Sequence, residues 1–276
     1  MSARSRRDAA LIALTLLACV FAAGPVIWGA LTSLKIPTQV VTYPPELLPK
    51  PPTLQNFIDV WNQTTFPVYF RNSLVVTVGA VVLSLVLALH AAYGLARFDF
   101  RGKTLLMLGI LATSMIPGIA ILVPLYNLSV QAKLYNTLTG MIIVYTAWNI
   151  PLVVWLLKGF FEKVPRELEE AALMDGCGRY RMFYLIVLPL ARPGILAASI
   201  MAMMAVWNDF LIGFTLAVSE QKRLLPFGLY TYISNVGVDW GQLMAATVLA
   251  LLPVVFAFLI MQKWLVQGLM AGAVKA

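Results

Sequence analysis

Residues 166–176 of the chain read RELEEAALMDG and form the centre of a charged region between about residues 158 and 192. Long apolar segments flank this region on both sides. The first eight of the quoted residues are mostly good helix formers, and Leu168, Ala171 and Ala172 fall at i, i+3 and i+4 on one helix face. The charged region is much longer than a tight turn requires. It therefore predicts a helix that lies outside the apolar part of the protein.

Signals for a turn and a second helix follow this stretch. Asp175 and Gly176 predict the turn, and residues 178–188 predict a second short helix with an apolar stripe. Pro189 and Pro193 are expected to end the segment, and Pro193 suits the first turn of the next helix. The pattern predicts a helix-turn-helix of the shape that docking onto a soluble partner needs.

The composition excludes an ordinary soluble domain. Of the 276 residues, 61% are hydrophobic and 12% are charged, whereas soluble domains carry roughly 25% charged residues. The two cysteines do not indicate a disulfide framework, because Cys19 lies in an apolar segment and Cys177 lies in the charged region. We therefore expect a protein that is embedded in a lipid bilayer.

Six apolar stretches are long enough to cross a membrane, which takes about 20 residues each. We predict membrane spans at about residues 8–31, 72–96, 104–126, 139–157, 194–218 and 243–264. The first stretch has no small-residue cleavage site before a soluble body, so we interpret it as an uncleaved span. The sequence thus predicts an all-α, polytopic membrane protein with a single transmembrane domain over residues 1–276 and a charged loop at 158–193.

The positive charges predict the side of the membrane on which each loop lies. If the N-terminus is cytoplasmic, 14 of the 20 Lys and Arg residues lie inside and 6 lie outside, which follows the positive-inside tendency. The inside set is Arg4, Arg6, Arg7, Arg97, Arg101, Lys103, Lys158, Lys163, Arg166, Arg179, Arg181, Arg192, Lys263 and Lys275. The outside set is Lys35, Lys50, Arg71, Lys133, Lys222 and Arg223. Both termini and the charged loop are then cytoplasmic, and the basic balance reflects topology and not binding to nucleic acid.

The largest predicted outer loop, residues 35–70, is rich in proline and in aromatic residues. Proline at this density favours a stiff, extended path, and aromatic side chains suit the membrane interface. The loop is either a structured connector or part of a platform for an external binding partner. Residues 219–242 form a second outer loop that could share the second role.

A motif in the charged loop resembles the EAA loop of ABC importer permeases. That family's pattern is E-A-A, three residues, G, nine residues and I-x-L-P, and every element falls in register here. The matching residues are Glu170-Ala171-Ala172, Gly176 and Ile186-Val187-Leu188-Pro189. Further segments are similar to carbohydrate-importer permeases of the maltose type, namely TSLK at 32–35, PTLQNF at 52–57, YGLAR at 93–97 and WNDF at 207–210. The resemblance covers nearly the whole chain.

The resemblance implies a type I ABC importer permease fold in which the EAA segment is a coupling helix seated in a cleft of a cytoplasmic ATPase. It implies that Glu170 contacts the ATPase and that Ala171 and Ala172 let the ATPase approach closely. Asp175 and Gly176 would make the turn between the two helices. Closure of the ATPase dimer on ATP would then move this helix as a rigid lever that tilts the spans.

The resemblance also implies the partners and the location. The partners are a second, paralogous permease subunit, a dimer of ATP-binding subunits and an extracytoplasmic solute-binding protein, in a bacterial inner membrane. The implied substrate is a mono- or oligosaccharide, whose identity the binding protein largely sets. Glycerol-phosphate uptake is the alternative within this class. A phosphorylated substrate favours basic groups in the cavity, and the predicted spans carry none at mid-depth.

The chain itself lacks the phosphate-binding loop G-x-x-x-x-G-K-[ST]. Gly102-Lys103-Thr104 matches the end of that loop, but Arg97 stands where its first glycine is needed. We therefore expect no catalytic residue, metal or cofactor in this chain, with ATP and magnesium bound by the separate ATPase. The single histidine and the lack of a nucleophile–base set also argue against a membrane enzyme.

Polar residues at bilayer depth are costly, and they mark candidate positions along a substrate path. The clearest are Trp207, Asn208 and Asp209, which fall halfway along the predicted fifth span. Asn208 and Asp209 are suited to hydrogen-bond sugar hydroxyls, and Trp207 is suited to stack on a sugar ring. Alternatively, Asp209 pairs with an Asn, Ser or Thr of a neighbouring helix and fixes packing. Tyr145 and Asn149 in the fourth span are second candidates.

Two local features complete the description of the predicted spans. The sequence Met-Ile-Pro-Gly at residues 115–118, together with Pro124, predicts a broken or kinked third helix. His90 is interpreted as a packed, hydrogen-bonded residue, with a proton relay as the alternative.

An ion-coupled secondary transporter, the alternative from a different functional class, would need intramembrane carboxylates and usually an inverted repeat. Asp209 is the only central carboxylate, and the sequence shows no such repeat.

Overall fold

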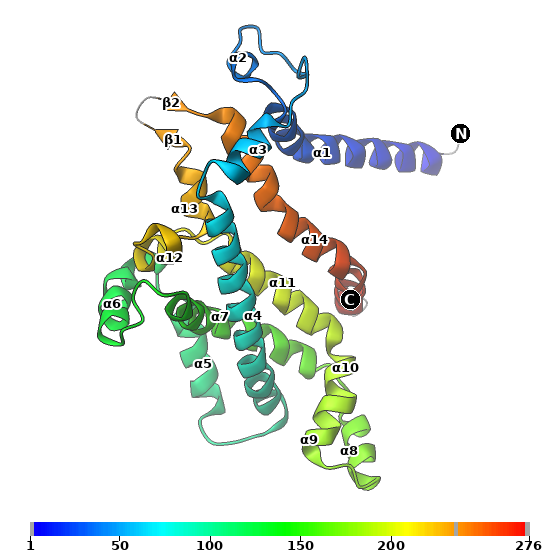
Figure 1. Cartoon of the computed structure of the whole chain (residues 1–276). Helices are drawn as coiled ribbons and strands as arrows, with labels where there is room; N and C mark the ends of the chain where they lie inside the picture. Colours follow the sequence, from blue (N-terminus) through cyan, green and yellow to red (C-terminus); the bar gives the residue numbers. More distant parts are fainter. Residues whose placement is uncertain (1–2, 235–236, 274–276) are drawn as a thin grey trace. The chain divides into compact units, whose positions relative to one another are not determined.

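The computed structural model describes residues 3–234 and 237–273, and this part of the chain is predominantly helical (Figure 1). The elements are α1 (Ala3–Ser33), α2 (Pro37–Val40), α3 (Gln55–Asn62), α4 (Phe66–Arg97), α5 (Lys103–Ser114), α6 (Gly118–Gln131), α7 (Leu138–Phe161), α8 (Arg166–Met174), α9 (Arg179–Met182), η1 (Phe183–Val187), α10 (Leu188–Leu190), α11 (Arg192–Trp207), α12 (Leu211–Leu216), η2 (Glu220–Lys222), α13 (Leu225–Tyr230), β1 (Ile233–Ser234), β2 (Gly237–Val238) and α14 (Trp240–Ala273). η1 is π-helix and η2 is 3₁₀-helix, and β1 and β2 pair as a short antiparallel hairpin. The expected all-α fold class is confirmed. Lys275, which the orientation prediction counts, lies outside the described residues.

The chain forms two compact units. The first comprises residues 1–67 and 228–252, and the second comprises residues 68–227 and 253–276. The proline-rich outer loop belongs to the first unit, whereas the charged loop and the candidate path residues belong to the second.

In the first unit, the TSLK and PTLQNF segments contact each other. Asn56 donates from Nδ2 to the carbonyl oxygens of Ser33 and Lys35, both at 2.8 Å. The buried Lys35 Nζ donates to the carbonyl oxygen of Glu46 at 2.6 Å and lies 4.7 Å from the centroid of the Trp28 ring. These contacts fold the start of the outer loop back onto the end of α1, as a structured connector. A role toward an external partner stays a prediction.

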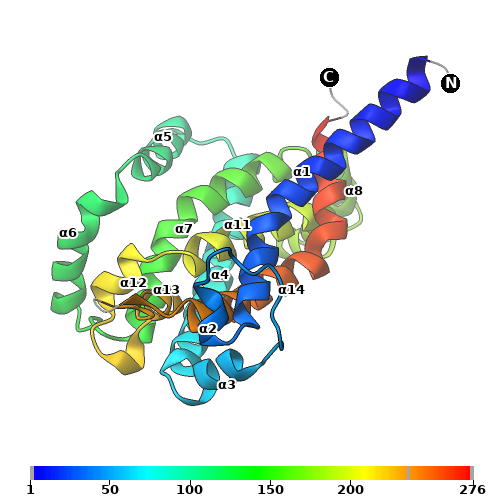
Figure 2. The ribbon, with the colours of Figure 1, turned by 90° about the horizontal axis from the view of Figure 1, so that it is seen from above.

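Among the described residues, four helices are long and apolar enough to cross a membrane, and two bent helix pairs bring the number to six if each pair is one span. The four are Leu11–Ser33, Phe66–Arg97, Leu138–Phe161 and Trp240–Gln262. The third predicted span is broken where the sequence indicates, because α5 and α6 meet at Pro117 with a bend of 94° (Figure 2). Pro124 lies inside α6 without ending it, so the break is at the Pro-Gly step.

The fifth predicted span differs from the structure. Residues 194–218 do not form one helix, because α11 ends at Trp207 and α12 begins only at Leu211. The local reason is Asp209, whose Oδ1 accepts the backbone N–H of Ile212 at 2.9 Å and so caps the start of α12. Trp207, Asn208 and Asp209 therefore lie at a break between two helices and not halfway along one.

Small residues let the helices of the second unit approach each other closely. Ala92 of α4 and Ala198 and Ala202 of α11 are buried in one cluster with side chains of α7. At the start of α11, a Cβ on Gly194 would lie 2.2 Å from the Phe160 ring of α7, so only glycine fits there. Close backbone approach through small residues is the usual way in which membrane helices associate.

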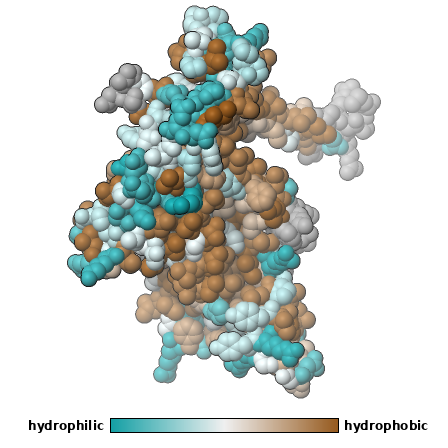
Figure 3. All heavy atoms as spheres, viewed as in Figure 1, coloured by the Kyte–Doolittle hydropathy of each residue, from teal (hydrophilic) through white to brown (hydrophobic). Residues whose placement is uncertain are grey.

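The surface of the second unit is largely apolar in the view of Figure 3. Large aliphatic side chains of α4, α5 and α6 are exposed, among them Val82, Leu105 and Ile119. Such a surface suits lipid or the apolar face of another membrane subunit. Polar residues gather at the end of this unit that carries α8 and α9 (Figures 1 and 3).

Candidate functional site

The charged loop forms the helix-turn-helix that the sequence predicts. α8 ends in a Schellman turn, in which Cys177 N–H donates to the carbonyl oxygen of Ala172 at 2.9 Å and Gly176 N–H donates to that of Leu173 at 3.1 Å. Gly176 has φ of +79°, a conformation that residues with a Cβ rarely adopt. The predicted turn at Asp175 and Gly176 is therefore confirmed, and a second helical stretch from α9 to α10 follows it.

The EAA residues divide between two faces of α8. Glu170 and Ala171 are exposed, whereas Ala172 and the preceding Glu169 are buried. Of the predicted apolar face of Leu168, Ala171 and Ala172, only Ala172 is buried against the chain, and the other two residues are exposed.

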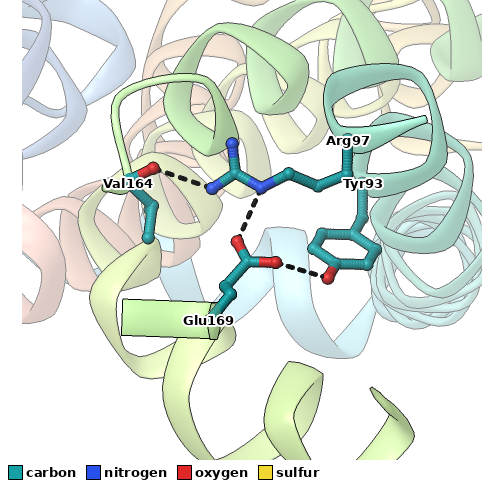
Figure 4. A network of polar contacts seen from close by, with 4 residues as sticks. All are labelled: Tyr93, Arg97, Val164 and Glu169. Carbon is teal, nitrogen blue, oxygen red and sulfur yellow. Dashed lines mark hydrogen bonds and ion pairs between the residues drawn. The ribbon is translucent and has the colours of Figure 1, made fainter. Parts of the chain in front are cut away.

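Glu169 is held by two side chains of α4 (Figure 4). Arg97 donates from Nε to Glu169 Oε1 at 2.6 Å, and the Tyr93 hydroxyl donates to Oε2 at 2.7 Å. Arg97 also donates from Nη2 to the carbonyl oxygen of Val164 at 2.8 Å. The Arg97 and Glu169 side chains are only 7% and 10% exposed, so this ion pair is nearly withdrawn from water. The sequence analysis did not identify Glu169 as an anchor, and it gave neither Tyr93 nor Arg97 a role in holding the charged loop.

A second contact joins α4 to the other helix of the loop. His90 Nδ1 lies 2.8 Å from the carbonyl oxygen of Val86, and Nε2 lies 3.0 Å from the hydroxyl of Tyr184 in η1. Because a carbonyl can only accept, Nδ1 donates to Val86, and Nε2 forms the hydrogen bond with the Tyr184 hydroxyl. The ring also packs against Phe183, with centroids 5.4 Å apart. These contacts favour the packed, hydrogen-bonded interpretation of His90 over a proton relay.

The structure brings together two of the candidate path residues, Tyr145 and Asp209. The Tyr145 hydroxyl donates to Asp209 Oδ1 at 2.8 Å, and the same oxygen accepts the N–H groups of Ile212 and Gly213 at 2.9 and 3.4 Å. These contacts tie the end of α11 to α7 and begin α12. They favour the packing alternative for Asp209, with a tyrosine in place of the expected Asn, Ser or Thr.

The other path candidates lie apart from this pair. Trp207 is buried, and its ring meets Phe70 edge-on at 5.9 Å. Asn208 is exposed and donates to the carbonyl oxygen of Met204 at 3.0 Å. Asn149 is buried, and no hydrogen-bond acceptor in the described part of the chain reaches its Nδ2.

A cavity of about 810 Å³ lies between the bent pair α5–α6 and α7. Its walls are mostly aliphatic, with Trp148 and Trp155 as aromatic members. Asn149 lines this cavity, whereas Tyr145, Trp207, Asn208 and Asp209 do not. Trp207 instead lines a smaller cavity of about 160 Å³, formed mainly by α4 and α11.

The sequence matches a known family over residues 80–270: "Binding-protein-dependent transport system inner membrane component". The chain belongs to this family. The motif in the charged loop and the apolar helices agree with that membership. The family description and these helices are consistent with a multi-pass protein of the inner membrane.

Individual members of the family resemble the chain along most of its length. A "Probable ABC transporter permease protein y4oR" of Sinorhizobium fredii is 37% identical, and the match covers 100% of this chain and 99% of that protein. The "Trehalose/maltose transport system permease protein MalG" of Thermococcus litoralis is 31% identical, with 81% of each protein covered. The expected resemblance to ABC importer permeases of the maltose type is confirmed.

A solved structure shares the fold of this permease. It is a chain from a bacterial ABC transporter involved in the import of the acidic polysaccharide alginate. The two folds superpose with a TM-score of 0.80, covering 96% of this chain and 99% of that one, at 22% sequence identity. The importer-permease fold is therefore shown independently of sequence motifs.

Proposed function

We propose that this permease carries a mono- or oligosaccharide across the inner membrane and that α8 couples it to a separate ATPase. The observation that carries the proposal is the division of α8 into two faces. Glu169 and Ala172 fasten the helix to the permease, which leaves Glu170 and Ala171 exposed for a partner. Leu168 and Met174 are exposed beside them, at 44% and 88%, and add an apolar contact surface.

The contacts between loops agree with the proposed grouping of loops on two sides of the membrane, in which α8 and both termini would lie in the cytoplasm. Arg97, at one assigned inner loop, pairs with Glu169 in the other. At the opposite end, Asn72 donates to the carbonyl oxygen of Gln221, and Asn136 accepts from the Ser219 N–H, so residues assigned to the outer side also meet. ATP and magnesium would bind to the ATPase dimer, and a second permease subunit and a solute-binding protein would complete the importer.

Two observations support a sugar as the substrate. The relative from Thermococcus litoralis is named for trehalose and maltose, and the solved structure for alginate. The 810 Å³ cavity is lined by tryptophan, Asn149 and aliphatic residues, with no Lys or Arg among its lining residues. Such walls suit a neutral sugar better than a glycerol phosphate, because a buried phosphate needs cationic partners.

Charge reversal on α8 tests the coupling. We expect Glu170→Lys to lose co-purification of the ATPase while the two permease subunits still assemble, because the change acts only on the exposed face. Asp99→Lys is the matched control. Asp99 is exposed in another inner loop, and the hydrogen bond from Lys103 at 2.9 Å keeps its pKa below the usual range, so it is charged at neutral pH. Retention of the ATPase by Glu170→Lys, or equal loss in both variants, would contradict docking through α8.

Uptake into proteoliposomes tests the substrate class. The complete complex with its binding protein would be offered labelled maltose, trehalose, N,N′-diacetylchitobiose and glycerol 3-phosphate, each with and without ATP. We expect ATP-dependent uptake of a sugar. Uptake of glycerol 3-phosphate alone would assign the chain to the phosphate branch, and uptake driven by an ion gradient without ATP would overturn the proposed importer.

A further inference from the structure

One face of α4 carries three polar residues that all point to the charged loop. His90, Tyr93 and Arg97 are spaced i, i+3 and i+7, which places them in one line along the helix. We call these three residues the α4 stripe. None of them belongs to the EAA motif.

The α4 stripe holds each part of the loop by a separate contact. Arg97 and Tyr93 bind Glu169 in α8, and Arg97 binds the Val164 carbonyl just before α8. His90 Nε2 forms a hydrogen bond with the hydroxyl of Tyr184 in η1. The entry to α8, α8 itself and the returning helix are therefore all attached to the same transmembrane helix.

Aromatic rings reinforce this attachment. The Tyr93 ring lies 4.7 Å from that of Phe183 in η1 and 5.8 Å from that of Phe161 at the end of α7. The Arg179 guanidinium lies 5.7 Å from the Phe98 ring, just beyond the end of α4. Phe161 and Phe183 are buried in the same cluster as Ala92 of α4. A close-packed contact of this kind transmits displacement, because it has little free volume to absorb it.

The covalent ends of the loop are less direct connections. The chain from η1 and α10 into α11 turns by 76° at Ala191, so a push along the first helix is not collinear with the second. At the other end, residues 162–165 separate α7 from α8 without a continuous helix. The polar and aromatic contacts with α4, in contrast, join α8 and η1 directly to a span.

We infer that α4 is the transmembrane helix that moves together with the coupling loop, and that His90, Tyr93 and Arg97 are positioning residues that lock the two into one body. This inference rests on the proposed function, because it concerns where a movement of α8 enters the membrane part. It predicts that breaking the lock separates ATP hydrolysis from import without detaching the ATPase.

The spacing between the loop and α4 tests the inference directly. In a Cys19→Ser, Cys177→Ser background, spin labels would be placed at Leu87→Cys on α4 and Leu185→Cys on η1, both exposed positions, at 48% and 62%. Distances would be measured by pulsed electron paramagnetic resonance in the assembled complex, without nucleotide and after trapping with Mg-ATP and vanadate. We expect one narrow distance that is the same in both states.

The matched variants separate positioning from stability. Arg97→Met with Glu169→Met removes both charges and leaves no lone buried ion, and we expect it to broaden the distance and to lower sugar import per ATP hydrolysed about tenfold, with the ATPase still bound. The control variant, Lys158→Gln with Glu162→Gln, removes an i,i+4 ion pair of 2.5 Å at the end of α7. This pair does not involve α4, so we expect the variant to change neither the spin-label distance nor the sugar import per ATP hydrolysed.

The possible failures are distinguishable. A wild-type distance that shifts on trapping would overturn the inference and leave the proposed function intact. The inference would also be overturned if the variant with both Arg97→Met and Glu169→Met kept the narrow distance and the wild-type sugar import per ATP hydrolysed. A purely structural role would lower ATPase activity and import together, in proportion to the assembled complex, and would also overturn it. Absence of the ATPase from the wild-type complex would overturn the proposed function, and the inference with it.

Discussion

Two carboxylates each anchor a helix in the second unit, and they do so in different ways. Glu169 and Asp209 both accept a hydrogen bond from a tyrosine, at 2.7 and 2.8 Å. Glu169 also pairs with Arg97, whereas Asp209 receives two backbone N–H groups, and in the described part of the chain no Lys or Arg forms a salt bridge with it. One anchor depends on balanced charge and the other on the geometry of a helix start. The first joins two separate elements, and the second defines where a new helix begins.

The largest expected effect comes from unbalancing the charged anchor. Arg97→Met leaves Glu169 buried without its cation, and removing one partner of a buried pair costs about 3–5 kcal/mol of stability. We expect Arg97→Met with Glu169→Met to recover most of this loss. The measurement is the free energy of unfolding of the purified permease in mixed detergent–SDS micelles. Equal losses in the single and double variants would mean that the charge pair does not dominate this anchor.

Asp209 is expected to behave differently when its charge alone is removed. Asp209→Asn keeps an oxygen acceptor for Ile212 and Gly213, so we expect stability and import close to those of the wild type. Asp209→Ala loses the cap and should cost about 1–2 kcal/mol. The same unfolding measurement, combined with sugar uptake, checks both variants. If Asp209→Asn stays stable but loses import, Asp209 contacts the substrate and the packing interpretation is wrong.

The two tyrosine hydroxyls should contribute less to stability than the ion pair does. Tyr93→Phe and Tyr145→Phe each remove one donor while leaving the carboxylate its other partners, and we expect losses of about 1–2 kcal/mol each. The two variants should be similar in stability. They should differ in the spin-label distance between the loop and α4, which only Tyr93→Phe can loosen. A broadened distance in Tyr145→Phe would show that the two anchors are coupled.

The two anchors also show what a sequence can and cannot reveal. The charged loop, its turn at Gly176 and the break at Pro117 were predictable, because each depends on local residues that favour or forbid a helix. The sequence did not predict which of the two adjacent glutamates faces inward. Glu169 and Glu170 lie about 100° apart around the helix, so only one of them can face α4. That choice depends on where Arg97 lies, which only the tertiary structure fixes.

The break at Asp209 was missed for a related reason. The residues around it include no proline or glycine between Ala205 and Ile212, so the apolar run reads as one helix. A usable signal was present, since an aspartate directly before a further apolar stretch is a typical helix cap. The same residue was instead weighed as a substrate ligand.

The contact between His90 and Tyr184 sets a limit on changes in the length of this loop. Each residue inserted into or deleted from α9 would rotate the following residues by about 100° and shift them by about 1.5 Å. Tyr184 would then leave His90, and the packing of Phe183 against Tyr93 would be lost as well. The nine-residue interval that separates Gly176 from Ile186 thus determines how Phe183 and Tyr184 are rotated about the helix axis relative to α4. We expect single-residue insertions there to be tolerated far less well than substitutions.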